Sequence, residues 1–195
     1  MSARGKRAYL LGVLLLTGAI ALWISEAKAG PVRYSMSFSA EFDLIPAGGR
    51  AAQRVRLYAT PTLVRLERAT GEAVFLYDPV KDQTTILFPL KKEYLVVSGP
   101  SEVSPFLPLP GGDPCGRALF QVRCRRLGVE PVAGRSAVKW EVGGPRGQLV
   151  WVDRELGLVL RRRLRDADLL RARHLRVGPQ RPDLFRIPSG YRRTG

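Results

Sequence analysis

The sequence is poor in the residues that most often build reactive sites. Of its 195 residues, only 2 are Cys, 2 are Met and 1 is His. A single His excludes a metal site made of several imidazoles, and the chain has no HExxH segment. A G-x-S-x-G nucleophile elbow and a glycine-rich phosphate loop with its Lys are also missing. We therefore expect a protein that is not an enzyme and that uses no cofactor and no metal.

Lysine and acidic residues are scarce relative to arginine. The chain has 32 basic residues, of which 6 are Lys, against 17 acidic ones, and its net charge is +15. One interpretation is attraction to an anionic partner such as a membrane surface, and the other is a solvated face rich in Arg. In the first case, the binding face would lie around Arg161–Arg165 and Arg171–Arg176.

One long apolar run is present, and it lies at the N-terminus. Residues 8–25 carry no charge, basic residues precede them, and the A-x-A triplet that ends at Ala29 follows. This order is typical of a signal peptide over residues 1–29, with Gly30 as the first mature residue. The alternative is an uncleaved inner-membrane anchor, because eighteen uncharged residues nearly span a bilayer. Both interpretations place residues 30–195, one domain, in the periplasm, where nucleic acid is not an expected partner.

The two cysteines, Cys115 and Cys124, are expected to form one disulfide. An even number of cysteines in an exported domain favours a bridge. Their spacing is too long for a CxxC redox pair, and a metal site would need further ligands that the sequence does not supply nearby.

The pattern of apolar residues predicts short antiparallel strands. Four apolar-rich runs between Leu63 and Val97 are separated by turns that contain Gly or Pro, which indicates a meander. From Tyr34 to Leu44, apolar residues alternate strictly with polar ones, which predicts a long strand with one apolar face. The triplet Ala133-Gly134-Arg135 is a hairpin-turn signal between two further strands.

Two segments do not follow this pattern of short strands and turns. Residues 98–117 contain five prolines, and they form either a lid over a cavity or a connection held on the surface. Residues 117–126 could form one short helix. Further along, Arg162 alternates with Leu160 and Leu164, so a charge enters an otherwise apolar face.

Three short motifs resemble the periplasmic lipoprotein-carrier (LolA/LolB-like) superfamily, and above all its uncharacterised exported relatives. The first is an Arg-bearing strand followed by Tyr77-Asp78-Pro79 and Gln83, with a shorter interval than in the true carriers. The second is a Trp–acid–turn–Gly-Leu segment from Trp151, and the third is a C-terminal Phe-x-Ile-Pro-x-Gly-Tyr ending at Tyr191. The resemblance implies a lipid-binding or lipoprotein-binding protein of the cell envelope.

The sequence and this resemblance together predict a mainly β fold: a strongly curved, half-open antiparallel barrel of ten to twelve strands, with a short helix or lid over its concave face. That face would hold an acyl chain or another hydrophobic ligand, and Arg56 or Arg65 would meet an anionic head group. A plain packed core is the competing interpretation, as are an Arg-rich binding module and a structural partner in an envelope complex. The sequence indicates no oligomeric state. The predicted ligand face comprises Tyr34, Met36, Phe38, Phe42, Leu57, Phe75, Tyr77, Trp140 and Trp151.

Overall fold

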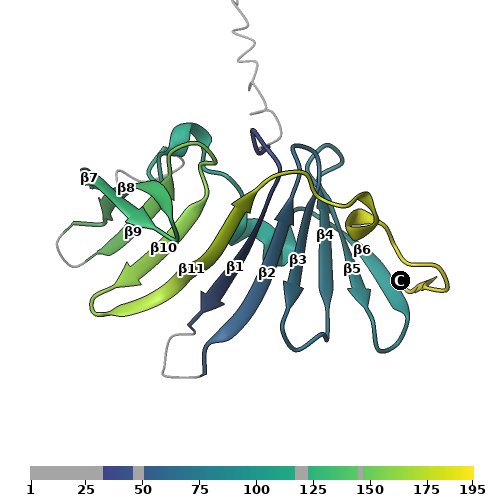
Figure 1. Cartoon of the computed structure of the whole chain (residues 1–195). Helices are drawn as coiled ribbons and strands as arrows, with labels where there is room; N and C mark the ends of the chain where they lie inside the picture. Colours follow the sequence, from purple (N-terminus) through teal and green to yellow (C-terminus); the bar gives the residue numbers. More distant parts are fainter. Residues whose placement is uncertain (1–32, 46–50, 117–122, 145–146) are drawn as a thin grey trace, which may run out of the picture.

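The computed structural model describes residues 33–45, 51–116, 123–144 and 147–195. This part of the chain forms one sheet of twelve strands in the order β12-β6-β5-β4-β3-β2-β1-β11-β10-β9-β8-β7 (Figure 1). Strands β1 to β6 span Phe38–Leu44, Gln53–Ala59, Val64–Arg68, Val74–Asp78, Gln83–Phe88 and Glu93–Ser98. Strands β7 to β12 span Cys124–Val132, Arg135–Val142, Gln148–Asp153, Val159–Leu164, Ala167–Val177 and Arg192–Arg193.

The sheet is a curved, half-open barrel, as the sequence predicts. Neighbouring strands pair antiparallel except β12, which runs parallel to β6. The meander β1–β6 meets the second group of strands, β7–β11, where β1 pairs with β11. Strands β7 and β12 lie at opposite edges and do not pair, so the barrel does not close.

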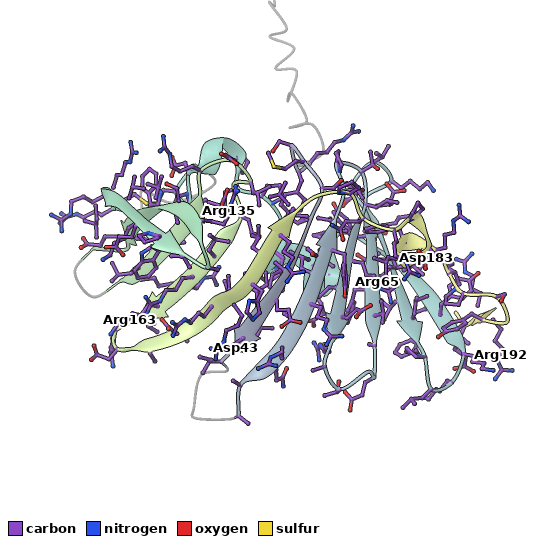
Figure 2. All side chains as sticks on the ribbon, viewed as in Figure 1. Asp43, Arg65, Arg135, Arg163, Asp183 and Arg192 are labelled. Carbon is purple, nitrogen blue, oxygen red and sulfur yellow. A yellow bond between two sulfur atoms is a disulfide. The ribbon has the colours of Figure 1, made fainter. Side chains whose placement is uncertain are left out.

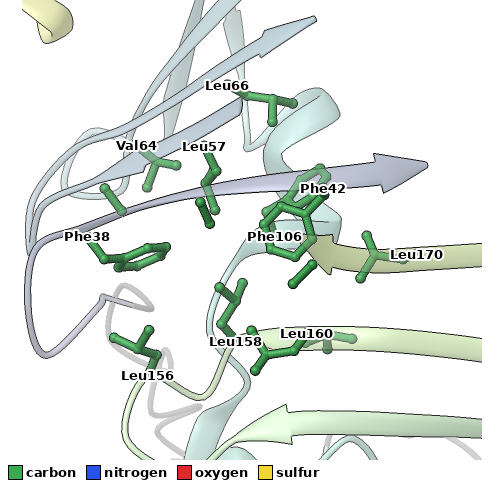
Figure 3. Packing of buried hydrophobic residues seen from close by; sticks show 14 of the residues in the cluster. Phe38, Phe42, Leu57, Val64, Leu66, Phe106, Leu156, Leu158, Leu160 and Leu170 are labelled. Atoms are coloured by element: carbon green, nitrogen blue, oxygen red, sulfur yellow. The ribbon is translucent and has the colours of Figure 1, made fainter. Parts of the chain in front are cut away.

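Strand alternation gives the sheet one apolar face, which lies on the inside of its curve. In β1, Phe38, Ala40 and Phe42 are buried, and in β2 the buried residues are Val55, Leu57 and Ala59. Because these residues face their cross-strand partners, they share one side of the sheet. From the other half of the barrel, Leu158, Leu160 and Leu170 join the same cluster (Figure 3).

A proline-rich crossover covers this apolar face. The chain leaves β6, the neighbour of edge strand β12, and enters β7 at the opposite edge, so the connection must cross the sheet. It contains two short 3₁₀ turns, η1 (Ser101–Phe106) and η2 (Pro110–Gly112). Val103 and Phe106 of η1 are fully buried against the sheet. We call residues 99–113 the cover.

The C-terminal segment crosses the opposite, polar face. After β11 the chain forms a third 3₁₀ turn, η3 (Pro182–Phe185), which lies over β3, and then pairs with β6 as β12 (Figure 1). The guanidinium Nη1 of Arg65 donates a 2.6 Å hydrogen bond to the carbonyl oxygen of Leu184. Figure 2 shows Arg65 and Asp183 close to this turn. The segment thereby caps one edge of the sheet.

Two local predictions differ from the structure, and a third lies outside the described residues. The alternating run from Tyr34 forms a strand only from Phe38, because Tyr34 and Met36 precede the residues that pair with β2 and β11. The helix expected at 117–126 is wrong at its C-terminal end, because β7 begins at Cys124, and residues 117–122 lie outside the described residues. The predicted signal peptide and its cleavage site also lie outside them. No helix in the described ranges is long and apolar enough to cross a membrane.

Candidate functional site: the apolar face and its cover

Aromatic rings form the centre of the apolar face. The rings of Tyr34 and Phe38 meet edge to face with centroids 4.7 Å apart. Phe42 meets Phe106 of the cover in the same manner at 5.2 Å (Figure 3). Such pairs stabilise by about 0.5–1.5 kcal/mol beyond the burial of their area. Phe106 of the cover therefore joins the aromatic rings of Tyr34, Phe38 and Phe42 on this face.

Few directional contacts hold the cover on the sheet. The hydroxyl of Tyr34 donates a hydrogen bond to the carbonyl oxygen of Phe106. The backbone N–H of Leu109 donates to the carbonyl oxygen of Gly157 at 2.9 Å. At the start of the cover, Thr84 Oγ1 donates to the carbonyl oxygen of Gly99 at 2.6 Å. Arg68 Nη2 of β3 also donates a 2.9 Å hydrogen bond to the Glu102 carboxylate of η1. Since 3₁₀ turns are short and poorly bonded internally, the cover depends on these contacts and on its buried side chains.

Tyr34 remains a neutral donor in this position. Complete burial raises the pKa of its phenol well above the ordinary value, because the charged form loses its hydration. The hydroxyl therefore keeps its proton and its hydrogen bond to the cover at every physiological pH.

Most of the predicted ligand-face residues come together on or beside this face. Phe38, Phe42 and Leu57 are fully buried in the cluster, and Phe75 and Tyr77 of β4 extend it across β3. Tyr34 is buried too, and Met36 and Trp140 are partly buried at its margin. In this conformation the cover and the sheet fill the space between them, so the face is packed.

Trp151 is the exception among these residues. It pairs across strands with Lys139 and Arg161, whereas Trp140 pairs with Val150, so the two indoles lie on opposite sides of the sheet. The cations of Lys139 and Arg161 sit 5.2 Å and 4.8 Å from its ring centroid. Its Nε1 donates a 2.8 Å hydrogen bond to Glu130. These contacts place the buried Trp151 in a cation–π cluster on the opposite side of the sheet from Trp140.

The two predicted head-group arginines also lie on the polar face. Arg56 alternates with the buried Leu57 and pairs with Glu41 at 3.3 Å. Arg65 alternates with the buried Leu66 and pairs with Glu67 at 2.6 Å. Strand alternation therefore keeps both guanidinium groups on the far side of the sheet from the apolar cluster.

The polar face carries ion pairs and a shallow groove. Arg161 bonds Asp168 at 2.8 Å, and Arg163 contacts Asp166 at 3.4 Å. A groove of about 330 Å³ opens on this face, and Arg56, Tyr58, His174 and Arg176 are among the residues that line it. His174 lines this groove together with Ser39 and its cross-strand partner Glu41.

The two cysteines are bonded to each other, as the sequence predicts. Cys115 and Cys124 form a disulfide with their Cα atoms 6.4 Å apart. Asp113 lies beside them and accepts a 2.8 Å hydrogen bond from the backbone N–H of Cys115. Although these three residues are close enough to ligate an ion, the bonded sulfurs offer no thiolate. The bridge ties Cys115, just beyond the cover, to the first residue of β7.

Sequence reasoning missed three leucines that complete the apolar face. Leu156, Leu158 and Leu160 are all buried against Phe38 and Phe106 (Figure 3). Leu156 lies in the turn after β9, Leu158 precedes β10 and only Leu160 is within the strand, so strand alternation alone does not identify them. They belong to the half of the barrel that the cover reaches last.

No protein-family model and no curated protein matches this chain. Solved structures with a similar fold include MucB, at 17% identity and a TM-score of 0.52 over 82% of this chain and 60% of MucB. The structure of the MucA/MucB complex from Pseudomonas aeruginosa is similar at 20% identity and a TM-score of 0.53, over 77% of this chain and 55% of the matched chain. An uncharacterized conserved protein from Thermus thermophilus is similar at 16% identity and a TM-score of 0.51, over 82% of this chain and 90% of that protein.

These likenesses concern the fold. The chain spans less than two thirds of the length of MucB. At 20% identity or less, these likenesses support the predicted architecture and assign no family.

Proposed function

We propose that this protein is an exported, non-enzymatic binding protein of the cell envelope that holds the acyl chain of a lipid or lipoprotein between its concave apolar face and the cover. The observation that carries the proposal is the nature of the covering layer. One proline-rich crossover covers an apolar face drawn from both halves of the barrel. An acyl chain would replace the contacts of Val103 and Phe106 with similar apolar contacts, so displacing the cover would expose little apolar area to water.

The family resemblance and the disulfide support the location and the class of ligand. A disulfide between Cys115 and Cys124 is typical of an oxidising compartment such as the periplasm. The expected signal peptide at residues 1–29 would take the chain there. The partner would be a lipid or the lipid-bearing end of a lipoprotein, and the polar face would point to solvent or to the membrane surface.

The alternative of an Arg-rich module for anionic polymers has weaker support. Arg161, Arg163 and Arg173 are each paired with an aspartate on the polar face. Paired guanidinium groups must break these contacts before they bind another anion. Binding through this face would also weaken steeply with added salt, whereas binding of an acyl chain under the cover would not.

Binding of a fluorescent long-chain fatty acid tests the proposal, with Tyr34→Phe as the informative variant. The substitution keeps the ring but removes the hydrogen bond to the Phe106 carbonyl. A net hydrogen bond of about 0.5–1.5 kcal/mol predicts ligand entry that is roughly 2- to 12-fold faster. Tyr58→Phe is the matched control, since Tyr58 lies on the polar face. Wild-type protein that binds no fatty acid, or binds it only at low salt, would contradict the proposal.

A further inference from the structure

Cross-strand pairing places several arginines of the described strands on the apolar side of the sheet: Arg68 pairs with Val55, Arg126 with Trp140 and Arg162 with Val150. Arg68 forms an ion pair with Glu102 of the cover at 2.9 Å and Arg126 is exposed, whereas Arg162 is partly buried.

Cross-strand pairing places Trp140 of β8 beside Val150 of β9, Val150 beside Arg162 of β10, and Arg162 beside Leu170 of β11. Leu170 in turn pairs with Leu44 of β1. Because directly paired residues share a face, these five side chains form one row across five strands, on the face that carries Leu160 and Phe42.

The arginines on either side of Arg162 in the sequence behave differently. Arg161 and Arg163 point to the polar face, where each pairs with an aspartate. Within the described residues, Arg162 makes no ion pair, and its Nε is buried without a hydrogen-bond partner. The Nε of Arg163 is also buried without a partner, but Nη2 of Arg163 contacts Asp166 at 3.4 Å. Arg162 is partly buried, and burying part of a guanidinium group without a partner is costly, so this side chain can take an acceptor that the described chain does not supply.

A second unused donor lies in the same row. The indole Nε1 of Trp140 is also buried and has no hydrogen-bond partner in the described ranges. Trp140 and Arg162 are two strands apart, about 10 Å at the usual strand spacing, with Val150 between them. A guanidinium and an indole N–H that flank one short aliphatic side chain can both donate to a ligand group placed above it.

We infer that Arg162 and Trp140 bind the acidic head group of the acyl ligand, a carboxylate or a phosphate, while its chain runs along the apolar face toward Phe42. This inference rests on the proposed function and adds the charge and the orientation of the ligand. The head group would lie above Val150, between Trp140 and Arg162, and two residues along β10 the same face ends at the exposed Leu164. In this proposal Arg162 contacts the anionic head group, and Arg56 and Arg65 do not.

Binding of four lipids to wild-type protein, Arg162→Gln and Arg163→Gln tests the inference. The lipids are palmitate, its methyl ester, a phosphatidic acid and the matching diacylglycerol. Wild-type protein should prefer an acidic lipid to its neutral partner by about 10- to 100-fold, the range of a charge-assisted hydrogen bond. Arg162→Gln should abolish this preference, and Arg163→Gln should keep it. A larger difference in affinity between palmitate and its methyl ester indicates a carboxylate ligand, and a larger difference between phosphatidic acid and diacylglycerol indicates a phosphate ligand.

Two results would overturn the inference while leaving the proposed function intact: equal binding of acidic and neutral lipids by wild-type protein, or an unchanged preference in Arg162→Gln. Failure of all four lipids to bind would overturn both. Ligand-free protein gives an independent readout, because removing an unpartnered half-buried cation should raise the melting temperature in Arg162→Met. A lower melting temperature would assign Arg162 a structural role instead. Trp140→Phe, which keeps the ring and removes the donor, should weaken binding of the acidic lipids alone.

Discussion

Asp153 shows how a single residue fixes the second half of the barrel. Its side chain is 1% exposed and its carboxylate accepts hydrogen bonds from Arg135 at 2.8 Å and 3.2 Å. The backbone N–H groups of Glu155 and Leu156 also donate to it, at 2.9 Å and 2.8 Å. These bonds hold the turn that delivers Leu156 and Leu158 to the apolar face.

Replacing Arg135 by Met should destabilise the fold strongly. The substitution leaves the Asp153 carboxylate buried without its cation, and breaking a buried pair in this way costs about 3–5 kcal/mol. Urea unfolding at pH 7 measures the loss. The control is Arg163→Met on an exposed ion pair, which should change the free energy of unfolding by about 1 kcal/mol or less. Equal effects of the two substitutions would contradict this role for Asp153.

Acid should remove part of the stability through the same carboxylate. Burial alone would raise the pKa of Asp153, but the hydrogen bonds from Arg135, Leu156 and Glu155 outweigh it and hold the pKa below its ordinary value. A carboxylate with a lowered folded-state pKa stabilises the fold above its unfolded pKa of about 3.9, and this contribution is lost as the pH falls through the folded-state value. Unfolding free energies measured from pH 6 to pH 2 should therefore fall less steeply in Asp153→Asn than in wild-type protein.

At the scale of elements, the sequence predicted strands better than it predicted which side chains face each other. The meander and the Ala133–Gly134 turn follow from local turn residues and alternation, and the structure confirms both. Alternation also explains why Arg56 and Arg65 cannot reach the apolar face, since each neighbours a buried leucine. The opposite orientations of Trp140 and Trp151 depend on pairing between β8 and β9, and spacing along the chain does not reveal that register.

The cover should loosen when Gly157 is replaced by Ala. Gly157 has a φ of +64°, and a Cβ there would lie 3.0 Å from the carbonyl oxygen of Leu109 in the cover. Gly134→Ala is the matched control, because its φ is +76° and its Cβ would meet nothing within 4 Å. Both variants should lose about 1–2 kcal/mol to left-handed backbone strain. Only Gly157→Ala should lose more and become sensitive to protease within residues 99–113, so identical behaviour would argue against a cover anchored there.

The disulfide should stabilise the protein without being required for its sheet. Chain-entropy arguments give about 2.7 kcal/mol for a closed loop of roughly ten residues. Replacing Cys115 and Cys124 together by Ser should lower the melting temperature and leave the far-ultraviolet circular dichroism of the strands unchanged. Titration of free thiols in unreduced native protein would show instead that the bridge does not form.

At the scale of the whole molecule, the two crossing segments differ in role. The cover crosses the apolar face from β6 to β7, and the C-terminal segment crosses the polar face to cap β6. The long-range order of the sheet, with β1 beside β11, is set by packing between distant strands, and no local pattern in the sequence specifies it. The number of strands could be predicted from the sequence, because Gly and Pro residues mark the turns between strands.

We expect the mature protein to begin at Gly30. The A-x-A site before it favours cleavage by a signal peptidase. N-terminal sequencing of protein recovered from the envelope measures this directly. Recovery of the intact N-terminus in the inner-membrane fraction would show that residues 8–25 act as an anchor.

Native mass spectrometry of the protein purified from its own envelope, without detergent, is the most direct measurement of the central claim. We expect a population of protein that carries one acyl-bearing molecule per chain, and chloroform extraction should release it as an acidic lipid or an acylated peptide. Phe38→Asp, which places a charge at the centre of the apolar face, should prevent this. Wild-type protein that appears only at its unliganded mass, and whose extract contains no lipid, would contradict the account.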